Sequence, residues 1–446
     1  MENRHLRVAI IGGGWAGAAA ALALSRHGTD VTIFEAAKIV GGRARRVEKD
    51  ARLFDNGQHL LLGAYARCIA LIESLHGVQT SDVLQRLSLA LHTVPHAHKP
   101  LAFNAPGVAA PLHLLLGLLS ATGFTASEKL KTIAWSTRHL LGIFSKASGA
   151  HVTVAQLIST QPASVRELLW EPLCVAALNT PAERATASVF IEVLRRAFLG
   201  DTRASDMLIP RIDLSALFPE PALKEVARLG GNVRLGSVIS AVNDEPHQSQ
   251  CSVQTRDETL SFDRIVIATG PQHIARLLSN VAGTQNLCAA LDSLQYEPIS
   301  TLHYEFAAGI DPESSPMLML DGTPGQWLFA HRLANGQVRA SVVISAHYRE
   351  ASEETLLHDG LAQLKKSYAL PAPLWQQLIT EKRATYSCTP SQTAMLKTLP
   401  RCIGRIHFAG DWCTPELPAT LESAVIAGEH AATDIMKTRA EISELN

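Results

Sequence analysis

The stretch 6–36 most constrains the fold, because it contains a strand, a glycine-rich turn, a helix and a second strand in succession. LRVAII at 6–11 and VTIFEA at 31–36 are apolar and β-branched, as expected of strands buried on both faces of a parallel sheet. GGGWAG connects the first strand to an alanine- and leucine-rich helix that ends near Gly28. This order predicts a Rossmann-like α/β domain that binds a dinucleotide.

Four residues of this unit have predicted roles in binding the dinucleotide. Gly12 allows the tight turn, Gly14 lets a pyrophosphate approach the backbone, and Gly17 lets the helix pack closely on the strand. The positive end of the helix dipole then faces the phosphates. Glu35 ends the second strand, where its carboxylate can accept hydrogen bonds from ribose hydroxyls.

The segment GGRARR at 41–46 follows the second strand. Its two glycines allow close backbone approach, and Arg43 and Arg45 can each bind phosphate oxygens through two nitrogens. A solvated basic loop is the alternative interpretation.

The segment RLFDNGQHLLLGAY at 52–65 places two polar side chains at the start of an apolar run. An Asn-Gly turn precedes Gln58 and His59, and three leucines follow them. These side chains either face a reacting group or form ordinary hydrogen bonds at the edge of a buried strand.

The remaining chain alternates helical and strand segments, so the nucleotide-binding domain is expected in three pieces. Residues 66–205 are predicted to be mostly helical, strands return around 225–270, and strands predominate at 296–346. The predicted division is a first nucleotide-binding part at 1–80, a helical substrate- and membrane-facing insertion at 81–205, a second nucleotide-binding part at 206–285, a substrate-domain sheet at 286–392 and a third nucleotide-binding part at 393–446.

Composition excludes several classes of function. A net charge of −1 provides no electrostatic surface for nucleic acid. The seven cysteines form no CxxC pair, which favours a reducing compartment over a disulfide framework. The N-terminal sequence MENRHLRVAIIGGG has no cleavable apolar region, so a cytoplasmic protein is expected. His92, His96 and His98 stand in a proline-containing loop with no nearby cysteine or carboxylate, and no metal site is predicted.

Residues 100–127 contain no Asp, Glu, Lys or Arg. Prolines and glycines interrupt the segment, and its leucine-rich centre is shorter than the ~20 residues that a spanning helix needs. We expect a helix that lies on a membrane surface or lines an apolar tunnel, with a buried core helix as the alternative.

Several motifs together resemble the flavin amine oxidase and carotenoid desaturase superfamily. They are GGGWAG, FEA, GGRARR, ATGP and the terminal FAGDWCTPELPATLESAVIAGEHAA, which follow the superfamily order over nearly the whole chain. Within it, DNGQHLLLGAY and WEPLCVAALNTPAERA are similar to the squalene-associated desaturase branch, that of the hydroxysqualene dehydroxylases.

The resemblance implies a FAD-binding domain with an inserted substrate domain of helices and mixed sheet. It assigns the pyrophosphate to the first glycine motif, ribose to the end of the second strand, adenine to the backbone of a later strand, and the isoalloxazine to the loop after GGR and the last helix. The implied cofactor residues are Gly12, Gly14, Trp15, Ala16, Gly17, Glu35, Ala36, Gly42, Arg43, Arg45, Gly57, Gln58, His59, Leu60, Val238, Gly410, Asp411, Leu421 and Ala424.

One position departs from the amine oxidases of this superfamily. They usually carry an aromatic residue before the proline of the final motif, where this chain has Leu417. An aromatic face stabilises a cationic amine, whereas an aliphatic side chain favours an apolar substrate. Glu171 and Asn179 are polar residues on an otherwise apolar helix, and they are either satisfied core residues or candidates for binding a substrate hydroxyl.

The implied reaction is the reduction of hydroxysqualene to squalene, in which reduced flavin N5 delivers hydride and the hydroxyl leaves as water. Gln58 and His59 are expected beside the flavin, and His59 and Glu422 are candidates for the acid. The alternatives are a carotenoid desaturase or isomerase, an amine oxidase, and a non-catalytic flavoprotein that holds lipid. The implied location is the inner face of the cytoplasmic membrane, in association with other squalene-forming enzymes.

Overall fold

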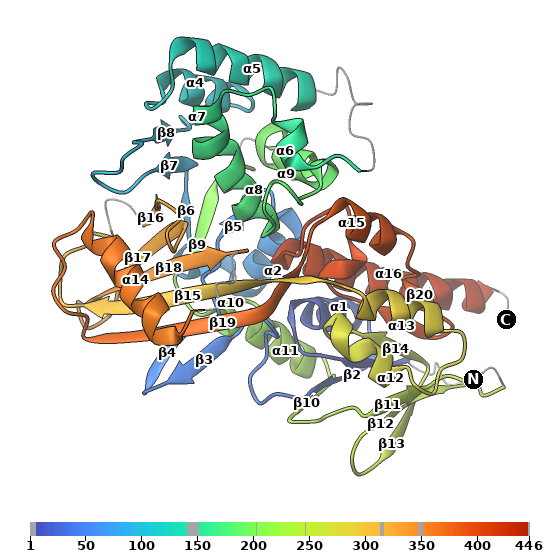
Figure 1. Ribbon diagram of the computed structural model, residues 1–446. Coiled ribbons are helices and arrows are strands. Elements are labelled where there is room, and N and C mark those ends of the chain that lie inside the picture. Colours follow the sequence, from blue (N-terminus) through green and yellow to red (C-terminus); the bar gives the residue numbers. More distant parts are fainter. Residues whose placement is uncertain are drawn as a thin grey trace.

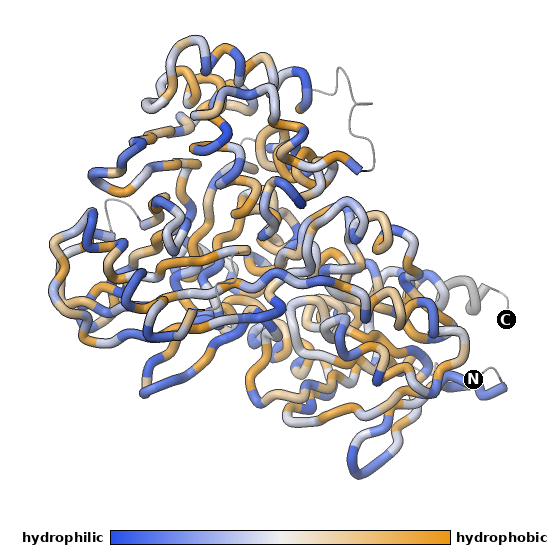
Figure 2. Tube along the Cα trace, viewed as in Figure 1, coloured by the Kyte–Doolittle hydropathy of each residue, from blue (hydrophilic) through white to orange (hydrophobic). Residues whose placement is uncertain are grey.

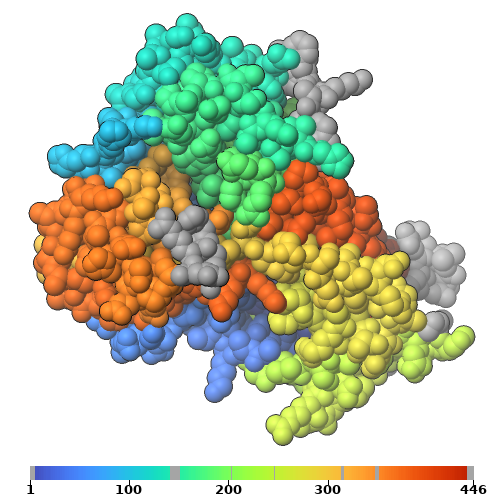
Figure 3. Space-filling model, in the orientation of Figure 1, coloured from blue at the N-terminus to red at the C-terminus, as the bar shows by residue number. Residues whose placement is uncertain are grey.

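The computed structural model describes residues 6–140, 151–201, 203–245, 247–312, 316–346 and 351–444. Figure 1 shows an α/β layer around β2 (Asp30–Glu35) and β14 (Arg264–Ile267), with an antiparallel sheet beside it. A group of helices from α4 (Leu112–Ser120) to α9 (Ala187–Leu199) lies above that sheet. Figure 3 shows the teal and green helical residues seated against the orange and red residues of the other layers. The expected architecture, a Rossmann-like α/β domain with helical and mixed-sheet insertions, is confirmed.

A six-stranded sheet forms the centre of the α/β layer. Its strands, in spatial order, are β10 (Asn232–Leu235), β2 (Asp30–Glu35), β1 (Arg7–Ile11), β14 (Arg264–Ile267), β21 (Ile406–Phe408) and β20 (Cys402–Ile403). All neighbouring pairs are parallel except β20 with β21. The strands come from three separated stretches of the chain, and the division into domains stays a prediction. Figure 2 shows hydrophobic residues along this sheet.

Helix packing against the sheet depends on small residues. α1 (Trp15–Arg26) is buried along most of its length and packs against α16 (Leu421–Glu444). A Cβ atom added at Gly428 would lie 2.2 Å from the carbonyl oxygen of Ala16. Only glycine therefore lets α16 approach α1 this closely.

Smaller elements complete the α/β layer. β11 (Ala241–Asn243), β12 (Cys251–Gln254) and β13 (Thr259–Phe262) form an antiparallel sheet. The accompanying helices are α10 (Leu214–Leu217), α11 (Pro219–Arg228), α12 (Ile274–Leu277), α13 (Gln285–Asp292) and α15 (Pro390–Lys397). β3 (Arg46–Lys49) and β4 (Arg52–Asp55) form a hairpin whose tip is hydrophilic (Figure 2).

A five-stranded antiparallel sheet forms the second layer. Its strands, in spatial order, are β16 (Met317–Met319), β17 (Trp327–Arg332), β18 (Val338–Ser345), β15 (Tyr296–Phe306) and β19 (Trp375–Tyr386). α14 (Glu353–Lys365) contacts β15 and β19. Side chains from all five of these strands also line a cavity described below, so the sheet supplies one wall of it.

The region predicted to be mostly helical also contains short strands. Its helices are α2 (Ala66–His76), α3 (Thr80–Val83), α4 (Leu112–Ser120), α5 (Ala126–Leu140), α6 (Val154–Leu157), α7 (Ala163–Val165), α8 (Glu171–Leu178) and α9 (Ala187–Leu199). The strands are β6 (Leu84–Leu87), β7 (Ala90–His92) and β8 (Ala102–Asn104), and β6 pairs through β9 (Met207–Pro210) with β5 (Leu61–Leu62). They were missed because strands of three or four residues are too short to show an alternating pattern. No helix in the described ranges is long and apolar enough to cross a bilayer.

Candidate active site

The glycine turn between β1 and α1 has the close contacts that its spacing predicts. Gly12 has a φ of +113°, and a Cβ atom there would lie 2.7 Å from the carbonyl oxygen of Ala268. A Cβ atom at Gly17 would lie 1.9 Å from the carbonyl oxygen of Gly12. These two glycines are therefore required by the fold itself.

Gly14 differs from its two neighbours in the motif. It has extended backbone angles, and its nearest neighbour for an added Cβ atom would be the Cα atom of Gly42 at 3.7 Å. The protein alone would accept a side chain at this position, so the glycine leaves room for a group that approaches the start of α1. This space at a helix N-terminus fits the pyrophosphate of FAD.

Glu35 is held at the end of β2 by backbone amides. The Gly13 amide donates to its Oε2 atom at 2.6 Å, and the Ala37 amide donates to its Oε1 atom at 2.7 Å. The carboxylate is thus fixed beside the glycine turn, and its remaining lone pairs can accept bonds from a ribose. Val238 lies in a segment just before β11 rather than in a strand, and its side chain is 53% exposed.

The guanidinium group of Arg43 is held by two contacts within the protein. Its Nη1 atom donates to the carbonyl oxygen of Ala384 at 2.8 Å, and its Nη2 atom forms an ion pair with Asp411 at 2.7 Å. Burial lowers its pKa, but the pair with Asp411 raises it more, so the net pKa is raised. Arg45 donates to the carbonyl oxygen of Gly42 and closes its own loop. Contacts of either arginine with FAD stay a prediction.

The loop Gly57–Leu60, which includes Gln58 and His59, lines a cavity. The Nδ1 atom of His59 lies 2.9 Å from the carbonyl oxygen of Gly57. A carbonyl oxygen only accepts, so Nδ1 carries the proton and Nε2 is left as an acceptor. Burial and the charge of Arg43 lower the pKa of His59, although its bond to Gly57 opposes them. The ring is therefore neutral at pH 7.

Glu422, in the first turn of α16, caps the N-terminus of α2. Its carboxylate accepts hydrogen bonds from the Arg67 amide at 3.0 Å and the Cys68 amide at 2.8 Å, which belong to the first turn of α2. Burial raises its pKa, while these two bonds oppose the rise. Both oxygens are engaged, an arrangement typical of a cap. Its catalytic role stays a prediction.

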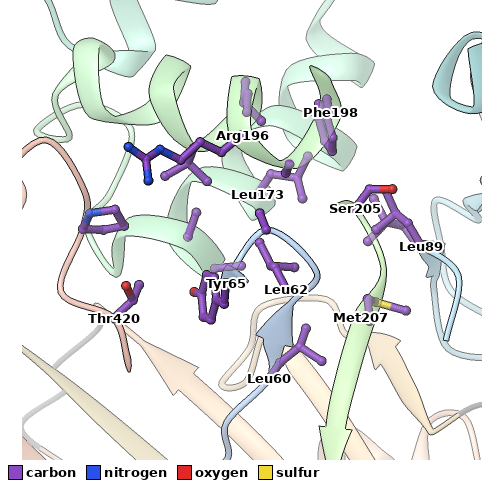
Figure 4. Close-up of a pocket in the computed structure, with 18 of the residues that line it drawn as sticks. Leu60, Leu62, Tyr65, Leu89, Leu173, Arg196, Phe198, Ser205, Met207 and Thr420 are labelled. Carbon is purple, nitrogen blue, oxygen red and sulfur yellow. The ribbon is translucent and has the colours of Figure 1, made fainter. Parts of the chain in front are cut away.

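The cavity lies between the helical region and the five-stranded sheet. It has a volume of about 630 Å³. Apolar side chains dominate its walls, among them Leu89, Phe103, Leu118, Trp170, Phe329 and Val343. Figure 4 shows Tyr65 and Thr420 side by side below Leu173, with Leu60 and Met207 further along the wall.

The cavity brings together only some of the predicted site residues. Those that line it are Arg43, Gly57, Gln58, His59, Leu60, Leu417, Leu421, Glu422 and Asn179, whereas Glu171 lies elsewhere. Sequence reasoning missed Tyr65, Glu381 and Thr385, which also line it. Tyr65 ends the segment 52–65 that contains Gln58 and His59, so its position could have indicated it. No local motif marks Glu381 or Thr385, because the fold brings their strand to the site from a distant part of the chain.

The fold and this site define a FAD-dependent oxidoreductase. The family described as flavin containing amine oxidoreductase matches residues 15–436, and the chain belongs to it. The prediction of FAD as cofactor is thereby confirmed.

Among curated proteins, the chain is similar to hydroxysqualene dehydroxylases over nearly its whole length. The protein of that name from Rhodopseudomonas palustris is 29% identical over 444 residues, which cover 95% of this chain and 97% of the relative. The one from Zymomonas mobilis is 27% identical, with the same coverage. The 15-cis-phytoene desaturase of Synechococcus elongatus is 22% identical over 98% of this chain and 97% of its own. The predicted resemblance to the hydroxysqualene dehydroxylase branch is confirmed.

Solved structures share the fold at lower identity. Cyclohexylamine oxidase from Brevibacterium oxydans has a TM-score of 0.72 at 16% identity and covers 98% of this chain and 100% of its own. Wild-type putrescine oxidase bound to putrescine has a TM-score of 0.71 at 16% identity, with 97% and 99% coverage. At this identity the similarity extends to the fold alone.

Proposed function

We propose that the protein reduces hydroxysqualene to squalene. The apolar cavity that reaches the loop Gly57–Leu60 is the observation that carries this proposal. A long isoprenoid gains from burial against such walls. The similarity to hydroxysqualene dehydroxylases over 95% of the chain supports the choice of substrate.

In this reaction the carbon–oxygen bond of the allylic alcohol breaks, and the oxygen takes up a proton and leaves as water. Reduced FAD, when bound, supplies the hydride that replaces the hydroxyl and is itself oxidised. The protein holds the chain in a dry cavity and orients the reacting carbon. Gln58 and His59 line the same cavity, and the neutral His59 presents its Nε2 atom as an acceptor.

A desaturase would run hydride transfer in the opposite direction, and the test must separate the two. Enzyme reduced with dithionite under anaerobic conditions is mixed with hydroxysqualene, and the products are analysed by mass spectrometry. We expect squalene in a single turnover, together with the return of the oxidised flavin spectrum. Bleaching of oxidised enzyme by phytoene, with no squalene from hydroxysqualene, would show a desaturase instead. No turnover with either would show a non-catalytic lipid-binding flavoprotein.

We also propose that α4 rests on the inner surface of the cytoplasmic membrane. Six large hydrophobic side chains between residues 108 and 130 are exposed, namely Val108, Leu112, Leu115, Leu116, Leu119 and Leu130. Leu112 and Leu115 also line the cavity. An exposed apolar helix that is continuous with an apolar cavity suits a substrate that arrives from a bilayer.

Two leucines allow a clean test of membrane contact. Leu116 and Leu119 are 39% and 47% exposed and lie outside the cavity lining, whereas Leu118 is buried. We expect Leu116→Lys with Leu119→Lys to lower cosedimentation with neutral phosphatidylcholine vesicles while FAD content stays unchanged. Val78→Lys with Leu374→Lys adds the same charge at other exposed positions and should have no effect. Equal vesicle binding by all three proteins would refute the contact.

A further inference from the structure

We propose that Asn179 and Thr385 form the site that binds the hydroxyl group of an apolar alcohol inside the cavity. This proposal rests on the proposed function and adds to it the chemical group by which the substrate is recognised. Both residues line the cavity, and both are at least nine-tenths buried. They are 206 residues apart in sequence and in direct contact in the structure.

The orientation of the Asn179 amide is fixed by two acceptors. Its Nδ2 atom donates to Thr385 Oγ1 at 3.0 Å and to the carbonyl oxygen of Glu297 at 3.4 Å. Because a carbonyl oxygen only accepts, the nitrogen must face Glu297, and the oxygen must face the other way. Among the residues that the structure describes, the Asn179 Oδ1 atom is buried and has no hydrogen-bond partner.

A buried acceptor without a partner is uncommon, and in a ligand cavity it points to a donor on the ligand. Thr385 supplies the complementary function. Its oxygen accepts from Asn179, and within the described ranges no acceptor is recorded for its own hydroxyl hydrogen. The pair therefore presents one acceptor and one donor, which is the complement of a hydroxyl group.

The position of the pair connects it with the reacting end of the cavity. Thr385 directly follows Ala384, whose carbonyl oxygen accepts from Arg43. Arg43 itself lines the cavity together with the loop Gly57–Leu60. A hydroxyl bound by the pair would therefore lie toward the loop that the resemblance places beside the flavin.

The backbone offers a competing explanation for Asn179. The residue ends α8 with a φ of 45° and a ψ of 36°, a left-handed conformation that asparagine and glycine tolerate well. Glycine at this position would keep the helix end and remove the amide. Asn179→Gly therefore separates a backbone role from recognition of the ligand.

Discrimination follows from the chemistry of the pair. An alcohol satisfies both groups, whereas the hydrocarbon left after loss of the hydroxyl satisfies neither. We expect the oxidised, FAD-loaded enzyme to bind hydroxysqualene about 10-fold more tightly than squalene, a ratio equal to about 1.4 kcal/mol. The product would then leave more readily than the substrate.

The test measures binding without turnover. Affinities of oxidised FAD-loaded enzyme for hydroxysqualene and squalene in detergent micelles are obtained from the perturbation of the flavin spectrum. We expect Asn179→Gly and Thr385→Val each to weaken binding of the alcohol about 10-fold and to leave binding of the hydrocarbon unchanged. Thr380→Val is the matched control, because Thr380 lies on the same strand and bonds to Ser300 outside the cavity lining.

Each outcome is decisive. An unchanged alcohol-to-hydrocarbon ratio in Thr385→Val would overturn the proposal even if Asn179→Gly did not fold. Equal binding of both ligands by the wild type would also overturn it. A ratio that is present in the wild type and lost in the variants, without any squalene formed by reduced enzyme, would support the site and refute the proposed reaction.

Discussion

The protonation state of His59 decides what this residue can do, and His59→Ala tests it. The Nδ1–H group donates to the carbonyl oxygen of Gly57 at 2.9 Å, which leaves Nε2 as an acceptor. Burial and Arg43 lower the pKa of the ring below its usual value of about 6.5. Near neutral pH, the protonated form that a general acid needs is therefore scarce.

The expected magnitude follows from this state. A neutral imidazole that accepts one hydrogen bond in the active site contributes about 0.5–1.5 kcal/mol, which corresponds to a rate loss of roughly 2- to 13-fold in His59→Ala. A positioned proton donor would instead cost on the order of 10²–10⁴ in rate. Loss of the bond to Gly57 should lower the free energy of unfolding by about 0.5–1.5 kcal/mol in addition.

The assay is single-turnover oxidation of the reduced flavin by hydroxysqualene, measured per bound FAD between pH 6.5 and 8.5. Wild type and His59→Ala should show pH profiles of nearly the same shape, because the lowered pKa keeps His59 mostly neutral across this range. A loss greater than about 100-fold, together with a wild-type rate that falls as pH rises and a variant rate that does not, would refute the neutral state and establish His59 as the acid.

Two further predictions concern the glycine turn at the start of α1 and the pH dependence of stability. Gly14→Ala should leave the unfolding free energy of the apoprotein within about 0.5 kcal/mol and abolish FAD retention, since its Cβ atom would meet only Gly42 at 3.7 Å. Gly17→Ala should destabilise the apoprotein itself. Calorimetry measures the stability of the two variants, and flavin content after gel filtration measures their FAD retention. Stable FAD binding by Gly14→Ala would contradict the assignment of the pyrophosphate to this turn. Burial raises the pKa of Asp55 to about 7, so the unfolded state loses its proton first and stability falls as pH rises from about 4 to 7, by at most about 4 kcal/mol. Asp55→Asn should remove this slope in urea unfolding at pH 4.5 and 8, and an unchanged slope would disprove it.

The parts of the site that the sequence predicts are those that depend on consecutive residues. Gly12, Gly17 and Glu35 lie within one β-turn-α-β unit, and local geometry determines their contacts. Glu422 illustrates the opposite case. Its place at the start of the last helix is visible in the sequence, but it caps α2, more than 350 residues away, because tertiary packing brings the two helix ends together. Only a tertiary structure shows that both of its oxygens are already engaged.

The polar groups of the cavity explain how one FAD-binding fold can serve different substrates. An aromatic residue before the final proline would offer its face to a cationic amine, but Leu417 occupies this position in the cavity lining. Among the described residues that line the cavity, the Asn179 side chain has a neutral oxygen that is buried and accepts no hydrogen bond. A neutral alcohol can donate to that oxygen without the desolvation cost of a buried ammonium group, so the apolar cavity favours an uncharged hydroxyl over an amine.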